Sequence, residues 1–356
     1  MVKKRVMVGM SGGVDSSVAA LLLKKKGYEV IGVFMKNWTH EQDTKACPWE
    51  DDYKDMRMVC EQLEIPYYTF NFEQEYRDRV FAYFLKEYKT GRTPNPDVMC
   101  NTEIKFRVFL ERAQELKADF IATGHYARTK KVGKTVHLLK GKDENKDQTY
   151  FIHHLAQDQL KRILFPIGHL PKPQVRQIAE NAGLVVAKKP DSQGICFIGK
   201  VDFRDFLAQY IPKKSGNIQT VEGQVLGTHI GLPFYTIGQR EGLGIGGTGP
   251  YFVVEKQIKT NTLIVAQGEH HPALFAKGLL AINVHWISGK EPKKLNMKAK
   301  IRYRTPDQSC KLVSTGKNSY KVYFTQAQRA IAPGQFVVFY SGQDCLGGGV
   351  IQKALT

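Results

Sequence analysis

The sequence predicts an α/β fold in which a doubly wound parallel sheet is followed by two smaller β-rich domains. In the first half, short Val- and Ile-rich runs alternate with segments whose apolar residues recur at helical spacing, as in parallel sheets. From about residue 215, glycine becomes frequent and β-branched residues alternate along the chain, which favours short strands and turns. We therefore expect an α/β domain at 1–201, a β-rich linker domain at 202–277 and a second β-rich domain at 278–356.

The expected elements of the first domain follow one another in strand–helix order. Strands are expected at 5–10, 28–35, 65–72 and 119–125, and helices at 14–26, 48–63, 74–89 and 107–117. The stretch 92–101 contains two prolines, for which we expect irregular structure. Further along we expect a hairpin with a loop at 128–149, broken helices at 150–183, an irregular piece at 188–200 and a short helix at 202–210.

A glycine- and serine-rich turn joins the first expected strand to the first expected helix. Ser11, Gly12 and Gly13 follow an apolar run that ends at Met10, and helical spacing begins at Val14. The free backbone N–H groups and the positive end of the helix dipole at such a turn attract anions. Glycine also lets the backbone approach a ligand closely. The turn is therefore predicted to bind phosphate.

Two common phosphate-binding patterns do not fit this turn. A Walker A loop carries a lysine before its final Ser or Thr, where this chain has Asp15 before Ser16. Further along the chain, Gly242, Gly244 and Gly247 match the G-x-G-x-x-G pattern, but no helix follows them. The motif SGGVDS instead resembles the PP-loop of ATP pyrophosphatases, which cleave ATP between the α- and β-phosphates and adenylylate a carbonyl oxygen. An ordinary strand–helix turn is the alternative.

Charge and composition narrow the class of protein. Lys and Arg number 52 against 34 Asp and Glu, so the net charge is +18 and the isoelectric point is about 9.5. Such an excess favours a polyanionic partner, most commonly nucleic acid. No apolar run is long enough to cross a membrane, and the apolar run before Ser11 is too short for the core of a signal peptide. We therefore expect a cytoplasmic protein without a membrane partner.

The six cysteines are sparse and contain no C-x-x-C pair, which argues against disulfide scaffolds, zinc ribbons and iron–sulfur clusters. Cys100 and Cys196 lie in stretches typical of exposed loops, whereas Cys60 lies among apolar residues of an expected helix. An accessible loop cysteine beside an ATP site is a candidate nucleophile, because the thiolate needs a polar and open setting. A small buried apolar role is the alternative for any one of them.

The segment KAKIRYR at 298–304 predicts a strand with one basic face. Its side chains alternate between basic and packing residues, with a period of two that places like residues on one side. Either a solvated face or a surface that contacts the RNA backbone fits this pattern.

Five separated motifs resemble the tRNA-specific 2-thiouridylases, the MnmA family. They are SGGVDSS, NPDVMCN, GHYAR, KDQTYF and DSQGICFIG, and they occur in this order. The resemblance runs along nearly the whole chain. It implies a PP-loop domain of the adenine nucleotide alpha hydrolase type, two β-rich domains of which the last is a β-barrel, and 2-thiolation of the wobble uridine of tRNA.

The resemblance implies a reaction in two stages. ATP adenylylates the 2-oxygen of the uracil, and a persulfide on Cys196 then attacks the same carbon so that AMP leaves. Cys100 is implied as the partner nucleophile, able to form a disulfide with Cys196. Asp97, three residues before Cys100, is expected to act as general acid/base. A turn-forming role after Pro96 is the alternative for Asp97.

The resemblance also implies binding residues, each of which has a structural alternative when taken singly. ATP would contact Gly9, Met10, Ser11, Gly12, Gly13, Val14, Asp15, Ser16, Met35 and Gly124. Mg²⁺ would arrive with ATP, near Asp15, and we expect no dedicated metal site, tightly bound cofactor or iron–sulfur cluster. The target base would contact Asn95, Pro96 and Asp97. The tRNA would contact His125, Lys146, Asp147, Gln148, Arg302, Tyr303 and Gln335.

The implied partners are tRNAs of the Lys, Glu and Gln types and a sulfur donor, either a cysteine desulfurase or a sulfur-relay protein. Two other functions stay open from the residues alone. One is a PP-loop enzyme that adenylylates a small acceptor. An enzyme with a small acceptor would not need the net charge of +18 that this chain carries. The other is a nucleotide-sensing RNA-binding protein without catalysis, which leaves the SGGVDS turn and the two cysteines unexplained.

Overall fold

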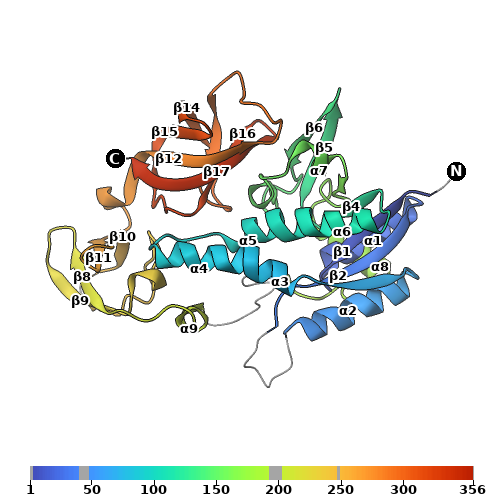
Figure 1. Cartoon of the computed structure of the whole chain (residues 1–356), viewed down its shortest axis with the longest axis horizontal. Coiled ribbons are helices and arrows are strands. Elements are labelled where there is room, and N and C mark those ends of the chain that lie inside the picture. Colours follow the sequence, from blue (N-terminus) through green and yellow to red (C-terminus); the bar gives the residue numbers. More distant parts are fainter. Residues whose placement is uncertain (1–2, 40–47, 192–202, 247–248, 356) are drawn as a thin grey trace.

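Residues 3–39, 48–191, 203–246 and 249–355 are described by the computed structural model. Their first region contains a parallel sheet of five strands in the order β3-β2-β1-β4-β7. In Figure 1, β1, β2 and β4 of this sheet lie towards the N-terminal end of the molecule. The strands are β1 Arg5–Met10, β2 Glu29–Lys36, β3 Tyr67–Asn71, β4 Phe120–Ala122 and β7 Ile163–Leu164. The expected doubly wound parallel sheet is confirmed. The expectation of helix at β7 was wrong, because a strand of two residues leaves no periodic pattern in the sequence.

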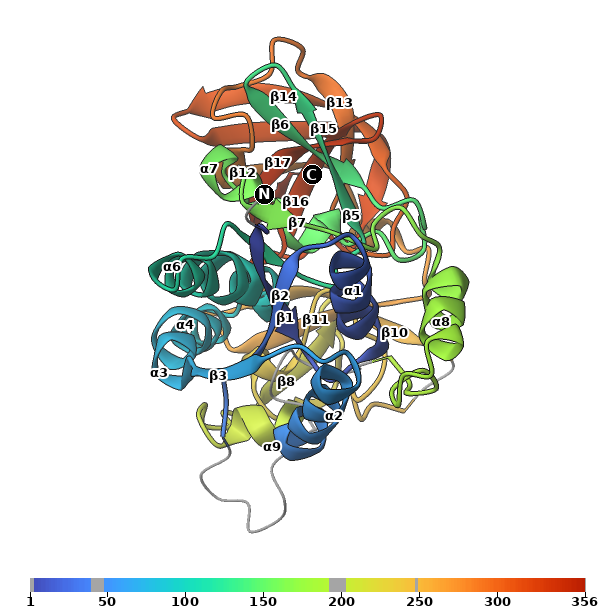
Figure 2. The same cartoon turned by 90° about the vertical axis from the view of Figure 1, so that its right-hand side faces the viewer.

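Helices cover both faces of this sheet, because the strand residues that point to each of the two faces are apolar. Val6 and Val8 of β1 face one core, and Met7 of the same strand faces the other. Figure 2 shows the helices of these two layers on opposite sides of the strands. One layer contains α1 Val14–Lys25, α2 Pro48–Gln62 and α8 Lys172–Asn181, and the other contains α3 Glu73–Tyr76, α4 Ala82–Lys89 and α6 Phe109–Glu115.

Two of the helical runs contain π-helical turns. The run that ends in α4 includes a π-helical segment at Arg77–Phe81. The run that ends in α6 begins with α5 Pro96–Met99 and continues through a π-helical segment at Cys100–Val108. The expectation of irregular structure over 92–101 was therefore wrong from Pro96 onwards. Proline is compatible with the first helical turn, where its missing N–H would have no intrahelical partner, and Asn95 caps the helix by accepting from Val98 N at 3.1 Å.

The middle of the chain forms a sheet of four strands in the order β10-β11-β8-β9. The short helix α9 Phe203–Ala208 precedes it, near the expected position. The strands are β8 Gly216–Thr220, β9 Val225–His229, β10 Tyr251–Gln257 and β11 Thr262–Gln267. Short 3-10 turns lie at Leu232–Phe234 and Pro272–Leu274.

The last strands close into the expected β-barrel, because β12 pairs with both β15 and β17. The hairpin of β5 Ala127–Val132 and β6 Thr135–Lys140 extends the same sheet, through pairing of Leu138 with Cys345. A 3-10 turn at Thr149–Phe151 and α7 Gln157–Leu160 follow that hairpin. The barrel strands are β12 Phe275–Trp286, β13 Asn296–Lys300, β14 Gln308–Gly316, β15 Ser319–Arg329, β16 Phe336–Ser341 and β17 Asp344–Leu355.

The basic strand expected at 298–304 is shorter than predicted. Strand β13 ends at Lys300, and a turn follows in which Thr305 Oγ1 donates to Arg302 O at 2.9 Å. Pro306 then removes a backbone donor that a continuing strand would need. The Lys300 side chain is 11% exposed and its ammonium lies 3.7 Å from Asp307, so this part of the expected face points inward.

Across the described ranges, no helix combines the length and the hydropathy that crossing a membrane would require.

Candidate functional site

The candidate site lies at the carboxyl edge of the five-stranded sheet, between β1 and β4. These neighbouring strands send the chain to opposite sides of the sheet, since β1 is followed by β2 on one side and β4 pairs on the other. Open α/β sheets bind ligands in the crevice at such a switch point. The Ser11–Gly13 turn follows β1, and Gly124 follows β4, so the predicted nucleotide residues of these two segments lie together.

Two glycines at this edge are required by close backbone contacts. Gly12 has a φ of +68°, and a Cβ there would lie 2.2 Å from the carbonyl oxygen of Asp52 in α2. A Cβ at Gly124 would lie 2.7 Å from the backbone nitrogen of Ser16. The turn is therefore held between the first turn of α1, the backbone of α2 and the end of β4.

The turn leaves the first amides of α1 without a side-chain acceptor. Gly13 is the N-cap and makes no side-chain hydrogen bond to the helix. The hydroxyls of Ser16 and Ser17 instead donate to Gly13 O at 3.1 and 2.9 Å, and Ser11 N donates to Ser16 Oγ at 3.2 Å. Helix N-termini of this kind bind anions through these amides and the helix dipole.

Apolar residues among the predicted nucleotide contacts are packed into the cores. Met10 and Val14 are 1% and 3% exposed, so only their backbone faces the turn. Met35 is 7% exposed, and its Cε would lie 3.0 Å from a Cβ at Gly9. This geometry favours the packing alternative for the Met35 side chain.

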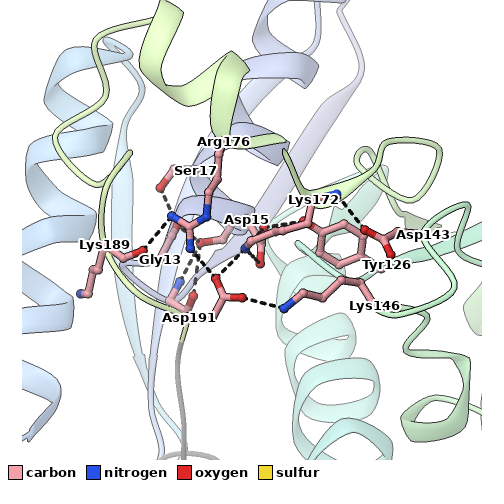
Figure 3. Close-up of polar contacts among 12 residues, drawn as sticks. Gly13, Asp15, Ser17, Tyr126, Asp143, Lys146, Lys172, Arg176, Lys189 and Asp191 are labelled. Atoms are coloured by element: carbon pink, nitrogen blue, oxygen red, sulfur yellow. Dashed lines mark hydrogen bonds and ion pairs between the residues drawn. The ribbon is translucent and has the colours of Figure 1, made fainter. Parts of the chain in front are cut away.

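An ionic cluster adjoins the turn, and sequence reasoning missed most of it (Figure 3). Lys172, the first residue of α8, lies with Nζ 2.8 Å from both carboxylate oxygens of Asp15 and 2.7 Å from Asp191. Tyr126 donates its hydroxyl to Asp15 at 2.8 Å. Lys146 and Arg176 also hold Asp191, at 2.7 and 2.8 Å. One signal was available, because a lysine in the first turn of a helix opposes the helix dipole and needs a compensating partner.

The electrostatics of the cluster keep Asp191 charged and Tyr126 neutral. Partial burial raises the pKa of Asp191, but hydrogen bonds from Lys146 and Lys172 outweigh it and lower that pKa to about 2. Burial and the neighbouring Asp15 carboxylate raise the pKa of Tyr126 far above its usual range, so its hydroxyl remains a donor. Within the described ranges, no group of three or more His, Cys, Asp or Glu side chains is placed to hold a metal ion.

A second hollow lies at the start of α5. It has a volume of about 350 Å³ and contains the predicted base-contact residues together with aromatic rings. The Phe203 ring lies 6.1 Å from Phe84 and 5.6 Å from Tyr88, centroid to centroid. The lining residues are Phe84, Tyr88, Pro94, Asn95, Pro96, Asp97, Phe203 and Thr236. We call this hollow the aromatic pocket.

The barrel reaches the rim of the aromatic pocket through Gln335. Its Nε2 donates to the carbonyl oxygens of Thr93 and Pro94, each at 3.0 Å, and its Oε1 accepts from Asn95 Nδ2 at 3.3 Å. The structure thus brings together a predicted tRNA contact and a predicted base contact that are 240 residues apart.

Cys100 does not lie in an exposed loop, and that expectation was wrong. It begins the π-helical segment after α5, and its side chain is 0% exposed within the core beneath the sheet. The helix that begins at Pro96 turns Cys100 inward, while Asp97 in the first turn lines the aromatic pocket. Cys60 is buried as expected, and Cys196 and Cys47 lie outside the described residues.

The predicted tRNA contacts differ in how much of each side chain is open. His125 is 8% exposed, with Nδ1 2.7 Å from Thr123 Oγ1, and burial followed by the charge of Lys105 lowers its pKa well below the usual range. Asp147 is 3% exposed and accepts from Gly141 N and Thr149 N. In this arrangement both side chains are buried, and each has hydrogen-bond partners within the chain.

The remaining predicted tRNA contacts are partly open. Gln148 accepts from Tyr126 N at 2.9 Å, which fixes it beside the ionic cluster with Lys146. Arg302 donates to Ala330 O at 3.0 Å, and the Tyr303 ring lies 4.5 Å from Phe151. Both lie in the turn after β13 rather than on a strand face.

Three family models cover almost the whole chain. The tRNA methyl transferase HUP domain matches residues 4–200, the tRNA methyl transferase PRC-barrel domain matches 204–267, and the aminomethyltransferase beta-barrel domain matches 276–351. Among solved structures, a 4-thiouridine synthetase–RNA complex with bound ATP covers 59% of this chain and 50% of its own, with 17% identity and a TM-score of 0.37, a likeness too weak to bear on function.

Curated relatives match over nearly their whole length. A protein named tRNA-specific 2-thiouridylase MnmA from Halalkalibacterium halodurans is 57% identical over 353 residues, which cover 99% of this chain and 95% of that protein. The same name is given to a protein of Streptococcus mutans that is 55% identical and one of Alkaliphilus oremlandii that is 54% identical, with 96% and 98% of those proteins covered and 99% of this chain in each case. The chain therefore belongs to the tRNA-specific 2-thiouridylase family.

Proposed function

We propose that this chain replaces the 2-oxygen of a tRNA uridine with sulfur, after ATP has activated that oxygen. The chain belongs to the 2-thiouridylase family, and the observation that carries the proposal is the helical run over residues 96–115. The run begins at the aromatic pocket with Asp97, contains Cys100 and ends against β1, where Phe109 would lie 3.5 Å from a Cβ at Gly9. It joins a site suited to a base with a site suited to phosphates.

The aromatic pocket suits a pyrimidine that has left its stack. Flipping a base out costs a few kcal/mol, which stacking on aromatic rings offsets. Phe84, Tyr88 and Phe203 supply such rings, and Asn95 and Asp97 supply polar groups for the edge of the base. We assign the target base to this pocket, with Asn95, Pro96 and Asp97 as its contacts.

In the first stage, the uracil 2-oxygen attacks the α-phosphorus of ATP. The bond between that phosphorus and the bridging oxygen breaks, and pyrophosphate leaves with the electron pair. The proton on N3 of the uracil is lost as the 2-oxygen becomes an ester, and the carboxylate of Asp97 accepts it. The backbone of residues 9–16 and Gly124 binds the nucleotide, with Mg²⁺ arriving on ATP.

In the second stage, the terminal sulfur of a Cys196 persulfide attacks carbon 2, and AMP leaves with its oxygen. The Cys100 thiolate, once its side chain has turned out of the core, then attacks the Cys196 sulfur, which forms a Cys100–Cys196 disulfide and leaves the second sulfur on the uridine. A reducing thiol must open this disulfide before the next turnover. A cysteine desulfurase or a sulfur-relay protein then restores the persulfide.

In this proposal each domain has its own function. The α/β domain at 1–201 activates the base, the barrel domain at 278–356 contacts the tRNA, and 202–277 links them. Lys146, Gln148, Arg302, Tyr303 and Gln335 are the partly open contacts with tRNA, and His125 and Asp147 hold the segments that carry them. We expect cytoplasmic tRNAs of the Lys, Glu and Gln types as substrates.

The test combines the full-length protein with tRNA, ATP–Mg²⁺ and a persulfide source, and measures 2-thiouridine and AMP. We expect both products. AMP without 2-thiouridine would indicate another acceptor, and tRNA binding without either product would indicate a binding protein. Either outcome overturns the proposal.

Matched variants test the roles of individual residues. We expect Cys196→Ser to lose 2-thiouridine and keep tRNA binding, while Cys310→Ala in the barrel core keeps both. We expect Asp97→Asn to slow AMP formation, whereas Asp78→Asn, an exposed carboxylate hydrogen-bonded to Gln74, does not. Full thiolation by Cys196→Ser would refute the persulfide assignment.

A further inference from the structure

The phosphate-binding turn has no lysine of its own, although ATP brings several negative charges to it. The turn supplies backbone amides and hydroxyls, and Asp15 adds a negative charge beside them. Pyrophosphate gains negative charge as it leaves the α-phosphorus. A cation near that position lowers the activation barrier most effectively when it is held in place beforehand. A cation beside the turn must therefore come from another part of the chain.

Lys172 is that cation. It reaches Asp15 from 157 residues away in the sequence, and its side chain is 9% exposed. It occupies the first turn of α8, where the helix dipole disfavours a positive charge. Its backbone N–H donates to Asp143 at 2.9 Å, and its ammonium lies between Asp15 and Asp191 (Figure 3). A lysine at an unfavourable helix position, pointed at the phosphate turn, has a role beyond ordinary surface pairing.

The partners of Lys172 can release it without being left uncompensated. Asp191 is also bound by Lys146 and Arg176, and Asp15 is also bound by the Tyr126 hydroxyl. Both carboxylates therefore keep a hydrogen-bond donor when the ammonium turns to another anion. Lys189 differs, because its two carboxylate partners, Asp52 and Asp55, belong to α2.

We propose that Lys172 is the phosphate-binding lysine of this site, which exchanges its carboxylate partners for the β- and γ-phosphates of ATP and neutralises the departing pyrophosphate. Asp15 and Asp191 position the ammonium until ATP arrives. The assignment rests on the proposed use of ATP. It replaces the lysine that a Walker A loop carries within the loop by one delivered from a separate helix.

The test measures binding of α,β-methylene-ATP, AMP and inorganic pyrophosphate to the full-length protein by calorimetry. Loss of a charge-assisted hydrogen bond predicts that Lys172→Met weakens α,β-methylene-ATP and pyrophosphate at least about tenfold and AMP less than about twofold. Lys189→Met is the matched control, since Lys189 is a partly buried lysine with two carboxylate partners near the same edge. We expect it to leave all three affinities unchanged.

A double variant separates phosphate binding from simple repulsion. Removing Lys172 exposes ATP to the charges of Asp15 and Asp191, which alone weakens binding. If repulsion were the whole effect, Asp191→Asn combined with Lys172→Met would restore much of the affinity for α,β-methylene-ATP. We expect the double variant to stay as weak as Lys172→Met, and Lys172→Arg to recover part of the affinity.

The possible failures are distinguishable. If the wild-type protein binds no α,β-methylene-ATP and forms neither AMP nor 2-thiouridine, the proposed function fails. If the wild-type protein does both and Lys172→Met binds all three ligands normally, only the assignment of Lys172 fails. Equal weakening of AMP and α,β-methylene-ATP, or an effect of Lys189→Met as large as that of Lys172→Met, also overturns the assignment.

Discussion

The phosphate edge and the contact between the α/β domain and the barrel are built in opposite ways. At the phosphate edge, one strand, one turn and one helix follow each other directly, and residues 9–16 carry nearly all the predicted nucleotide contacts. At the second region, which we call the joint, the segments 92–97 and 149–155 meet barrel residues such as His285 and Gln335 from far along the chain.

This difference determines what each region tolerates. The phosphate edge is held by close contacts between backbones, as at Gly12 and Gly124, so an added methyl group there has nowhere to go. The joint is held by side-chain hydrogen bonds and by rings, as at Gln335 and His153. We therefore expect large steric effects at the edge and smaller, pH-dependent or site-specific effects at the joint.

The largest effect is expected for Gly12→Ala. The substitution combines a left-handed φ of +68° with a collision between Cβ and Asp52 O at 2.2 Å. We expect the free energy of unfolding to fall by about 3 kcal/mol, from the dihedral strain and the collision together. Urea unfolding measures this change.

Gly27→Ala is the matched control for that substitution. Gly27 has a φ of +84°, but a Cβ there would meet nothing within 4 Å. Only the dihedral strain of about 1 kcal/mol is then expected. Equal losses for the two variants would mean that the close approach of α2 to the turn does not limit this position.

A second, smaller effect is expected from acid at the joint. His153 and His154 pack against Phe336 of β16, and neither Nε2 atom has a hydrogen-bond partner in the described ranges. Burial, followed by the charge of nearby His285, lowers the pKa of His154 to about 4. Burial, followed by the charge of His154, lowers the pKa of His153 well below its usual range.

The sign of the pH effect follows from these directions. Below about pH 6.5 the unfolded chain binds protons that the folded chain does not, so stability falls as the pH drops towards 4. The loss assigned to His154 is about 1–2 kcal/mol at pH 5. Unfolding curves between pH 7.5 and 5 should be less pH-dependent in His154→Gln. The exposed His270→Gln should behave like the wild type, and an unchanged slope in His154→Gln would contradict the expectation.

Most of the phosphate edge could be predicted from the sequence, because its geometry is local. The strand at 5–10, the SGG turn and the following helix are adjacent, so periodicity and glycine placement suffice. Lys172 escaped prediction because 157 residues separate it from Asp15 and no motif joins them. Strand β7 escaped because its place in the sheet is decided by pairing with β4 rather than by its own two residues.

The joint shows where local rules mislead. The prolines of 92–101 suggested irregular structure, but Pro96 begins a helix that carries Asp97 into the aromatic pocket and Cys100 into the core. Arg302 had the alternation of a strand face, yet its guanidinium turns to backbone carbonyls of Ile237 and Ala330. In both cases contacts with distant segments decided the outcome, and these contacts leave no periodic signal.

The smallest effect is expected for Gln335→Ala. This variant distinguishes two roles of the Gln335 side chain, which are to position the segment before Asp97 and to bind tRNA. The substitution removes two donors from the carbonyls of Thr93 and Pro94 and loosens the segment that starts the helix of Asp97. We expect kcat/KM for tRNA to fall about tenfold, or about 1.4 kcal/mol, with the binding of α,β-methylene-ATP unchanged. Gln328→Ala is the control, because the side-chain amide of Gln328 donates to Gln326 O on the same strand.

The split between kcat and KM decides which role dominates. If Gln335 mainly positions Asn95 and Asp97, kcat falls, because the base is held less accurately against Asp97. If it mainly binds tRNA, KM rises while kcat stays constant. We expect the fall in kcat, since all three described hydrogen bonds of the Gln335 amide go to residues 93–95 of the same chain. A pure rise in KM would instead mean that Gln335 acts mainly through its contact with tRNA, and would leave the positioning of Asp97 to the helix cap at Asn95.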